Sequence, residues 1–224
     1  MNAAELTGRT RTHVAAVIDA GVHLHVQVAA PFMNLRRRAQ HEGIDLVAVS
    51  GFRDFERQLA IWNGKYRGEK PLYDAAGKLL RTDALAGRER VDAILHWSAL
   101  PGASRHHWGT DVDLIDRRAI DSASVVKLTA AEYAPGGPFA PLAAWLEENA
   151  AQFGFFRPYR GIRSGVQPEP WHFSFAPLAE GARHALTPAI LRDAIEAAPL
   201  LGKEHVMPAL EELHARYVAA IDLP

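Results

Sequence analysis

Apolar residues recur at helical spacing in several segments of the chain. Over residues 31–41 they fall at Phe32, Leu35 and Ala39, which share one face of a helix. Gly43 follows this segment and can take the left-handed conformation that ends a helix. The same spacing predicts a helix that Asp54 caps and that reaches Tyr66, one from about residue 88 that ends before Pro101, one over residues 142–153, and two from Pro188 onward.

Short runs rich in β-branched and aromatic residues lie between these helices. Residues 44–50, with the sequence Ile-Asp-Leu-Val-Ala-Val-Ser, are bounded by two glycines and predict a buried strand. Residues 64–87 are polar and predict an excursion with a hairpin near Gly77. Helices and strands without repeated βαβ units favour an α+β fold. Further strands are predicted over residues 110–115, 155–157 and 171–175.

The charge balance argues against two classes of partner. The 224-residue chain has 26 acidic and 25 basic residues, so no broad positive field attracts nucleic acid or an anionic membrane. The three arginines at 36–38 point in different directions around a helix, and we interpret them as a solvated face. No segment is long and apolar enough to span a bilayer.

The absence of cysteine restricts the possible metal ligands, and the first thirty residues bear on the compartment. Without cysteine, disulfides and thiolate zinc sites are excluded, which leaves nitrogen and oxygen as metal ligands. The first thirty residues lack the basic start and apolar run of an export signal. We therefore expect a soluble chain, cytoplasmic as given, or in the periplasm or cell envelope if an export signal has been removed.

Two short segments concentrate the candidate chemistry. The first is Ser-Arg-His-His-Trp-Gly-Thr-Asp-Val-Asp over residues 104–113, and the second is Glu-Pro-Trp-His over residues 169–172. Together they supply imidazoles, a carboxylate and a spare glutamate. A catalytic zinc site with three protein ligands and one open position is built from such groups. Glu169 lies between two prolines, so it does not belong to a helical His-Glu-x-x-His motif.

Two residues in the first segment leave alternatives open. His107 adjoins His106 and could replace it as a metal ligand. If residues 110–115 form a strand, Asp111 and Asp113 share one face. Asp111 could then accept a hydrogen bond from a ligand imidazole or compete as a ligand, and we favour the first role.

The pattern Ser104-x-His106-x-x-Gly109-x-x-x-Asp113, followed by Glu169-x-x-His172, resembles that of the zinc D-alanyl-D-alanine carboxypeptidases and dipeptidases, which include vancomycin-resistance enzymes. Ser-Gly-Phe-Arg at residues 50–53, with Gln58 one helical turn later, extends the resemblance upstream. Where the family usually has a small residue, this chain has Asp111. The resemblance implies a small antiparallel sheet flanked by helices and these roles: metal ligands His106, Asp113 and His172; general base Glu169; oxyanion stabiliser Arg53; peptide-orienting residues Gln58 and Ser104.

The resemblance also implies a function and a division of the chain. We expect a zinc-dependent D,D-carboxypeptidase acting on the D-Ala-D-Ala end of peptidoglycan stem peptides or their fragments. The alternatives are an endopeptidase or L,D-carboxypeptidase with the same zinc site, and a non-catalytic zinc-binding module. We expect a variable lead-in over residues 1–29, the zinc peptidase domain over 30–180 and a C-terminal helical segment over 181–224 that packs on the same domain.

Overall fold

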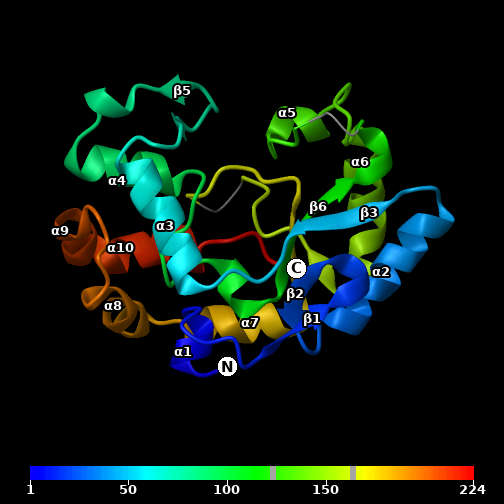
Figure 1. Ribbon diagram of the computed structural model, residues 1–224, viewed down its shortest axis with the longest axis horizontal. Coiled ribbons are helices and arrows are strands. Elements are labelled where there is room, and N and C mark those ends of the chain that lie inside the picture. The colour runs from blue at the N-terminus through cyan, green and yellow to red at the C-terminus, as the bar shows by residue number, and fades with distance from the viewer. Residues whose placement is uncertain (122–124, 162–164) are drawn as a thin grey trace.

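The computed structural model describes residues 1–121, 125–161 and 165–224 and has helices on either side of a small antiparallel sheet (Figure 1). This arrangement confirms the predicted α+β class. The central sheet has the strand order β3-β6-β8-β7, and two separate hairpins, β1-β2 and β4-β5, complete the described strands. The strands are β1 (Val14–Val17), β2 (Val22–His25), β3 (Leu46–Ser50), β4 (Leu72–Tyr73), β5 (Leu79–Leu80), β6 (Asp111–Asp116), β7 (Phe155–Phe156) and β8 (His172–Phe175).

Helices account for most of the remaining regular structure. Two of them, α2 and α6, pack with the central sheet, and α3 packs with α4 and the C-terminal helices. The described α-helices are α1 (Ala3–Leu6), α2 (Ala29–His41), α3 (Phe55–Tyr66), α4 (Gly87–Leu95), α5 (Ala130–Tyr133), α6 (Ala140–Asn149), α7 (Ala176–Ala185), α8 (Pro188–Glu196), α9 (Lys203–Val206) and α10 (Leu210–His214).

The register of the central sheet places residues that are distant in sequence directly opposite one another on neighbouring strands. Asp113 on β6 pairs with Ser50 on β3 and with His172 on β8, and directly paired residues of antiparallel strands face the same side. The alternate residues Val112 and Phe173 face the other side, into the core formed with α2 and α6. One face of the sheet is therefore apolar, and the other carries the polar residues of the predicted site.

Local sequence explains where the helices on either side of β3 in the chain, α2 and α3, begin or end. In α3, Asp54 caps the N-terminus, because its side chain accepts a hydrogen bond from the Arg57 N–H at 2.8 Å. Helix α2 begins at Ala29, two residues before the predicted start at Pro31, and continues to the predicted end at His41. Gly43 follows with a φ of 85°, as its place at the end of a helix predicts.

Residues 1–29 pack directly against the segment that carries the candidate chemistry. The His25 N–H donates to the Gly109 carbonyl at 2.8 Å, and Trp108 Nε1 donates to the Leu6 carbonyl at 3.1 Å. Gly109 has a φ of 66°, and a Cβ at this position would lie 2.6 Å from the Val14 side chain. Only glycine therefore fits at this turn, both for its backbone conformation and for the close approach of β1.

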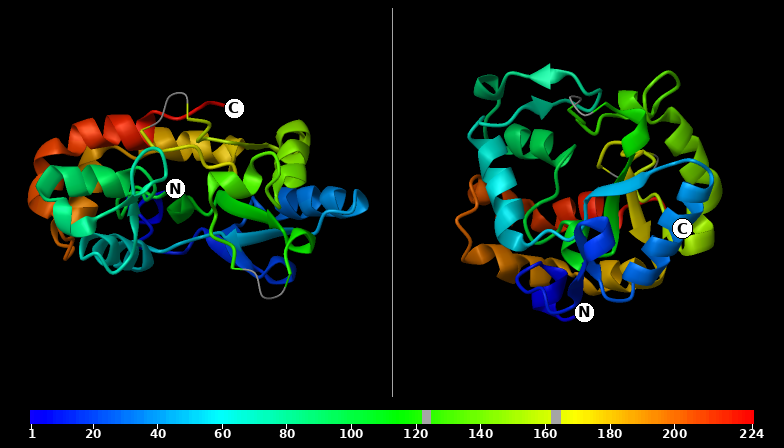
Figure 2. Two further views of the ribbon diagram at one scale, coloured as in Figure 1. Left: turned by 90° about the horizontal axis from the view of Figure 1, so that it is seen from above. Right: turned by 45° about the vertical axis from the view of Figure 1, so that its right-hand side comes forward.

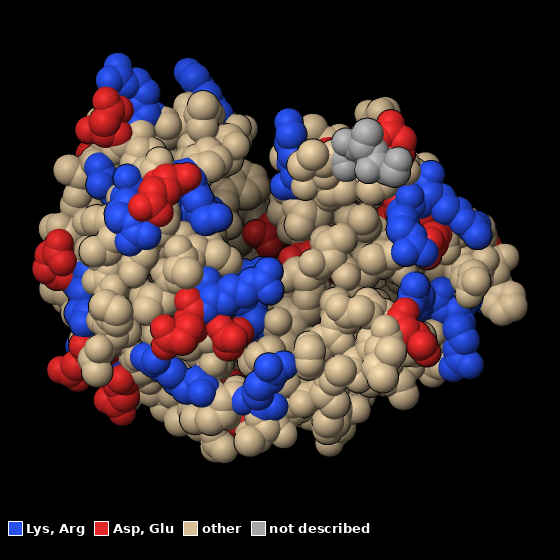
Figure 3. Space-filling model, in the orientation of Figure 1, with Lys and Arg blue, Asp and Glu red and all other residues tan. Residues whose placement is uncertain are grey.

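The molecule has two halves with separate apolar cores. One core joins α3, α4 and the helices after residue 176, and the other joins the sheet to α2 and α6 (Figures 1 and 2). Figure 3 shows a hollow between the two halves with acidic side chains at its floor. In the part of the chain that the structure describes, no helix has the length and apolar character needed to cross a membrane.

Candidate metal centre

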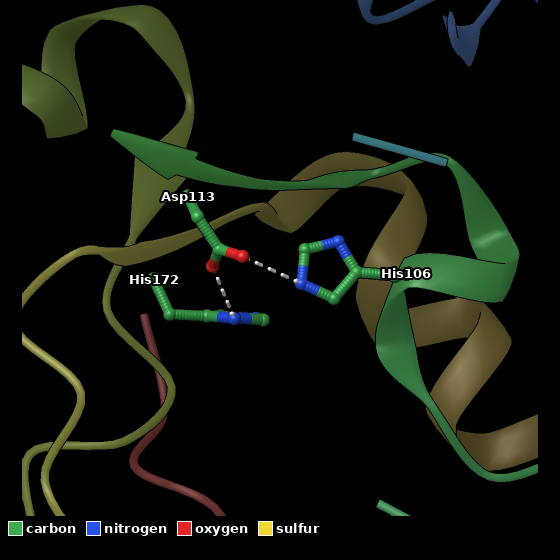
Figure 4. Close-up of side chains that lie close together, drawn as sticks. All are labelled: His106, Asp113 and His172. Atoms are coloured by element: carbon green, nitrogen blue, oxygen red, sulfur yellow. Dashed lines mark ion pairs between the residues drawn. The ribbon is translucent and has the colours of Figure 1, made fainter. Parts of the chain in front are cut away.

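Three side chains from separate segments meet on the polar face of the sheet (Figure 4). Asp113 comes from β6, His172 from the start of β8, and His106 from a single 3₁₀ turn, η3 (Arg105–Trp108). Among the described residues, these three form the one group of histidine and carboxylate side chains whose potential ligand atoms all lie within 4.8 Å of one another. All three side chains are buried.

The carboxylate of Asp113 lies between the two imidazole rings. Its Oδ2 is 3.3 Å from His106 Nε2, and its Oδ1 is 3.2 Å from His172 Nδ1. The rings are nearly perpendicular, with centroids 4.9 Å apart and planes at 82°. Burial opposes ionisation of Asp113, but the neighbouring imidazoles hold the pKa of its carboxyl far below the usual range.

The outer nitrogen of each ring already has a partner. His106 Nδ1 lies 2.8 Å from the Gly51 carbonyl, which can only accept, so Nδ1 carries the proton and Nε2 presents its lone pair toward Asp113. His172 Nε2 lies 2.9 Å from Asp111 Oδ1. Hydrogen bonds of this kind fix the ring orientation of metal-ligating histidines.

The donor set fits a divalent cation with nitrogen and oxygen ligands. Asp113 Oδ1 is buried and accepts no aligned hydrogen bond from any described residue, although a buried carboxylate oxygen normally has a partner. Two imidazole nitrogens and this oxygen face one small region. Three such ligands with an open fourth position are typical of catalytic zinc sites.

His107 lies outside this cluster. Its Nδ1 donates to the Arg53 carbonyl at 2.6 Å, and its Nε2 accepts from the Gly102 N–H at 3.1 Å. The ring is fully buried, and burial lowers the pKa of His107 to about 3. Both ring nitrogens are engaged by the backbone, so the geometry favours His106 over His107 as a ligand.

We expect the variant His107→Ala to keep its metal and lose stability. The substitution leaves a buried carbonyl and a buried N–H without partners, which should lower the free energy of unfolding by roughly 2 to 4 kcal/mol. Urea unfolding and metal analysis of the folded protein measure the two quantities separately. The exposed His41→Ala variant is the control, and loss of bound metal from folded His107→Ala would contradict this arrangement.

Asp111 lies behind His172, on the opposite side of the ring from Asp113. Its Oδ1 accepts from His172 Nε2 and from Arg105 Nε, each at 2.9 Å. Burial opposes ionisation of Asp111, but the charge of Arg105 and the hydrogen bond from His172 hold its pKa well below the usual range. The position supports the predicted role of Asp111 as an acceptor for an imidazole rather than as a competing ligand.

Glu169 reaches the cluster through a tight turn. The His172 N–H donates to the Glu169 carbonyl at 3.1 Å, and Glu169 Oε2 lies 3.4 Å from His172 Nδ1. Burial and the charge of Asp113 raise the pKa of Glu169 to about 7, while the positive charges of His172, Arg53 and Lys65 act in the opposite direction. A carboxyl group with this pKa can both accept and donate a proton near neutral pH.

Arg53 is held in place by two polar side chains. Its Nη1 donates to Gln58 Oε1 at 2.8 Å, and its Nη2 donates to Ser50 Oγ at 3.1 Å. Gln58 is completely buried and donates from Nε2 to the Ala99 carbonyl at 2.7 Å. Burial lowers the pKa of Arg53, and the charges of Asp113 and Glu169 raise it. The guanidinium therefore interacts electrostatically with Asp113 and Glu169, and Gln58 holds it from the side of α3.

Other polar side chains complete the surroundings of the cluster. Ser104 is buried immediately before η3, two residues from His106. Lys65 on α3 was missed by the sequence analysis, although it lies on the same helix face as Gln58, seven residues later. Burial lowers the pKa of Lys65 to about 8, and the charge of Glu169 opposes that shift. The ring of Tyr159, which no motif indicates, lies 5.1 Å from that of His172.

Comparison with known proteins decides the family. The model of the VanY family, described as D-alanyl-D-alanine carboxypeptidase, matches residues 21–178. The chain belongs to the VanY family. The match includes all the residues of the cluster, together with Arg53, Gln58 and Glu169, and confirms the resemblance seen in the sequence.

The relatives of this VanY-family chain differ in how much of their length they share with it. An uncharacterized protein of Haemophilus influenzae is 37% identical over 121 residues, covering 53% of this chain and 92% of the relative. A D-alanyl-D-alanine carboxypeptidase of Enterococcus faecalis is 28% identical over 161 residues, covering 70% of this chain. The aligned region spans 50% of the Enterococcus enzyme, so about half of that protein has no counterpart in the alignment.

Two solved VanY structures share the fold. VanYB in complex with D-alanine-D-alanine has a TM-score of 0.53 and 22% identity, covering 85% of this chain and 91% of that one. A mutant of the vancomycin-resistance D,D-pentapeptidase VanY in complex with Zn(II) has a TM-score of 0.52 and 24% identity, covering 88% and 90%. These similarities agree with the predicted small antiparallel sheet flanked by helices.

Proposed function

We propose that this VanY-family hydrolase is a zinc-dependent D,D-carboxypeptidase that releases the terminal D-Ala from the D-Ala-D-Ala end of peptidoglycan stem peptides or their fragments. The observation that carries this proposal is the buried cluster of His106, Asp113 and His172 with Glu169 beside it. A purely structural metal site would need neither Glu169 nor Arg53, which disfavours a non-catalytic module.

His106 Nε2, His172 Nδ1 and the Asp113 carboxylate would hold the zinc. Their chemistry fits this ion, and the hydrogen bonds of the outer ring nitrogens leave the inner ones available. When bound, zinc supplies a Lewis acid that polarises the scissile carbonyl and lowers the pKa of the attacking water. The remaining steps fall to side chains of this protein.

Glu169 is the general base and then the general acid. Its carboxylate takes a proton from the attacking water and returns that proton to the nitrogen of the departing D-Ala. The pKa of about 7 suits both transfers near neutral pH. This role is supported by the distance of 3.4 Å between Glu169 Oε2 and His172 Nδ1, one of the atoms that would hold the metal.

Arg53 stabilises the negative charge that develops on the carbonyl oxygen during attack. A cation fixed before the reaction begins stabilises such charge without reorganising, and Gln58 and Ser50 fix this one. We expect Gln58 to act on the substrate through Arg53, because its side chain is completely buried. We expect Ser104, two residues before His106, to help orient the peptide.

Product analysis with a muramyl pentapeptide tests this function. We expect a mass loss of one alanine from a peptide ending in D-Ala-D-Ala and none from the matched peptide ending in L-Ala-L-Ala. Inverting a Cα exchanges methyl and hydrogen in a fixed pocket, and a misplacement of about 1 Å can cost on the order of a hundredfold in rate. A chelator should stop the release, and added zinc should restore it.

Each of three other outcomes would contradict the proposed specificity and indicate a different peptidase activity. Hydrolysis of free D-Ala-D-Ala with the pentapeptide left intact would indicate a dipeptidase. Cleavage of cross-linked peptides with an intact pentapeptide would indicate an endopeptidase, and cleavage only of a tetrapeptide would indicate an L,D-carboxypeptidase. The polar excursion over residues 64–87, which contains the β4-β5 hairpin, is where we expect such specificities to be decided.

A further inference from the structure

A buried ion pair lies directly behind His172. The side chains of Arg105 and Asp111 are 3% and 0% exposed, and Arg105 Nε is 2.9 Å from Asp111 Oδ1. The same Oδ1 lies 2.9 Å from His172 Nε2, so one oxygen joins the guanidinium to the imidazole. This pair takes no part in the hydrolysis described above.

The fold holds both members of the pair in place. Asp111 pairs with Ser174 across β6 and β8, two residues along each strand from the pair of Asp113 and His172. Arg105 Nη2 donates to Ser174 Oγ at 2.6 Å, and its guanidinium carbon lies 4.7 Å from the centre of the Trp108 ring. The other carboxylate oxygen of Asp111 accepts from the Thr110 hydroxyl.

From these contacts we propose that Arg105 and Asp111 act together as a positioning pair that fixes the His172 ring with Nδ1 toward Asp113 and thereby sets the affinity for zinc. This inference rests on the proposed zinc site. The Oδ1 atom of Asp111 is the hydrogen-bond partner of Nε2, so Nδ1, which lies 3.2 Å from Asp113 Oδ1, is the nitrogen left to present a lone pair to a metal. Arg105 supplies the charge that a completely buried carboxylate requires.

Stabilisation of the fold alone does not explain the buried ion pair of Arg105 and Asp111. Buried ion pairs often contribute no more to folding than apolar residues of similar volume would. Arg105 Nη1 is buried and has no hydrogen-bond partner among the described residues, which is unfavourable for the folded state. The Oδ1 atom of Asp111 is instead directed at a metal-facing histidine, as expected of a group that orients a ligand.

Two variants test the pair. Asp111→Asn removes the charge but keeps the shape, and the double variant Arg105→Met with Asp111→Ala removes both charges so that neither is left unpaired. We expect both to bind zinc about 10- to 100-fold more weakly, as is typical when the outer partner of a metal-ligating histidine is lost. A competition titration with a chromophoric chelator measures the affinity. The visible spectrum of the Co(II)-substituted protein, which we expect to change, reports the ligand geometry.

Asp45→Asn is the matched control, because it removes the carboxylate from an ion pair with the exposed Arg117, just beyond the other end of β6. Its zinc affinity should equal that of the unmodified protein. Folded test variants with unchanged affinity and Co(II) spectrum would overturn the proposal, and so would a failure of both to fold, because the pair would then be structural. Zinc affinity is independent of hydrolysis, so a chain that binds zinc without releasing D-Ala would contradict only the proposed function.

Discussion

Replacing Glu169 with glutamine should leave the zinc in place and remove nearly all hydrolysis. Glutamine has the shape of the glutamate but cannot take a proton from water, and a positioned general base contributes typically about 10²- to 10⁴-fold to the rate. We therefore expect kcat to fall by that factor while the zinc content stays at one ion per chain. Metal and activity separate in this variant because Glu169 lies beside the three proposed ligands and is not one of them.

Metal analysis and the initial rate of D-Ala release, measured on the same preparation, check this expectation. Glu56→Gln is the control, because Glu56 is an exposed glutamate on α3 that pairs with Arg9 and has no contact with the cluster. Loss of zinc together with activity would show that Glu169 is a ligand, and unchanged activity would remove it from the mechanism.

Replacing His172 with alanine should abolish stoichiometric zinc binding and, with it, all activity. The substitution removes one of three ligands and leaves the Asp111 carboxylate with one partner fewer, so the remaining donors are His106 and Asp113. Two protein ligands do not form a catalytic zinc site of the usual kind. Added zinc should not restore hydrolysis at concentrations that saturate the unmodified protein.

The exposed histidine variant His184→Ala should retain both properties and is the control for this experiment. Circular dichroism establishes that the His172→Ala chain is folded before its metal content is measured. A folded variant that still binds one zinc per chain would show that the metal lies elsewhere, and the assignment of His172 would be wrong.

Short-range patterns predicted much of the fold. The apolar face at Phe32, Leu35 and Ala39 indicated α2, and Asp54 indicated the start of α3, because capping and helical periodicity depend on residues a few positions apart. The hairpin predicted within residues 64–87 is present as β4-β5. The cluster residues were recognised as candidates because their spacing within each segment is short and resembles that of a known family.

Long-range contacts could not be predicted in the same way. Nothing in the spacing shows that Asp113 pairs with His172, which lies fifty-nine residues later, or that Arg105 binds Asp111 behind the same ring. The packing of residues 1–29 against Gly109 also depends on contacts between distant segments. Adjacent histidines in sequence are equivalent until their backbone partners are known, which is why His107 stayed an alternative to His106.

The proposed site is tested most directly by a crystal structure of the zinc-loaded protein with the metal located by its anomalous scattering. We expect one zinc ion within about 2.0 to 2.2 Å of His106 Nε2, His172 Nδ1 and an oxygen of Asp113, with the fourth position open to water. Asp111 should remain hydrogen-bonded to His172, and Glu169 should lie beside the metal without binding it. A zinc ion closed by a fourth protein ligand such as Asp111, His107 or Glu169, or bound away from this cluster, would contradict the proposed catalytic site.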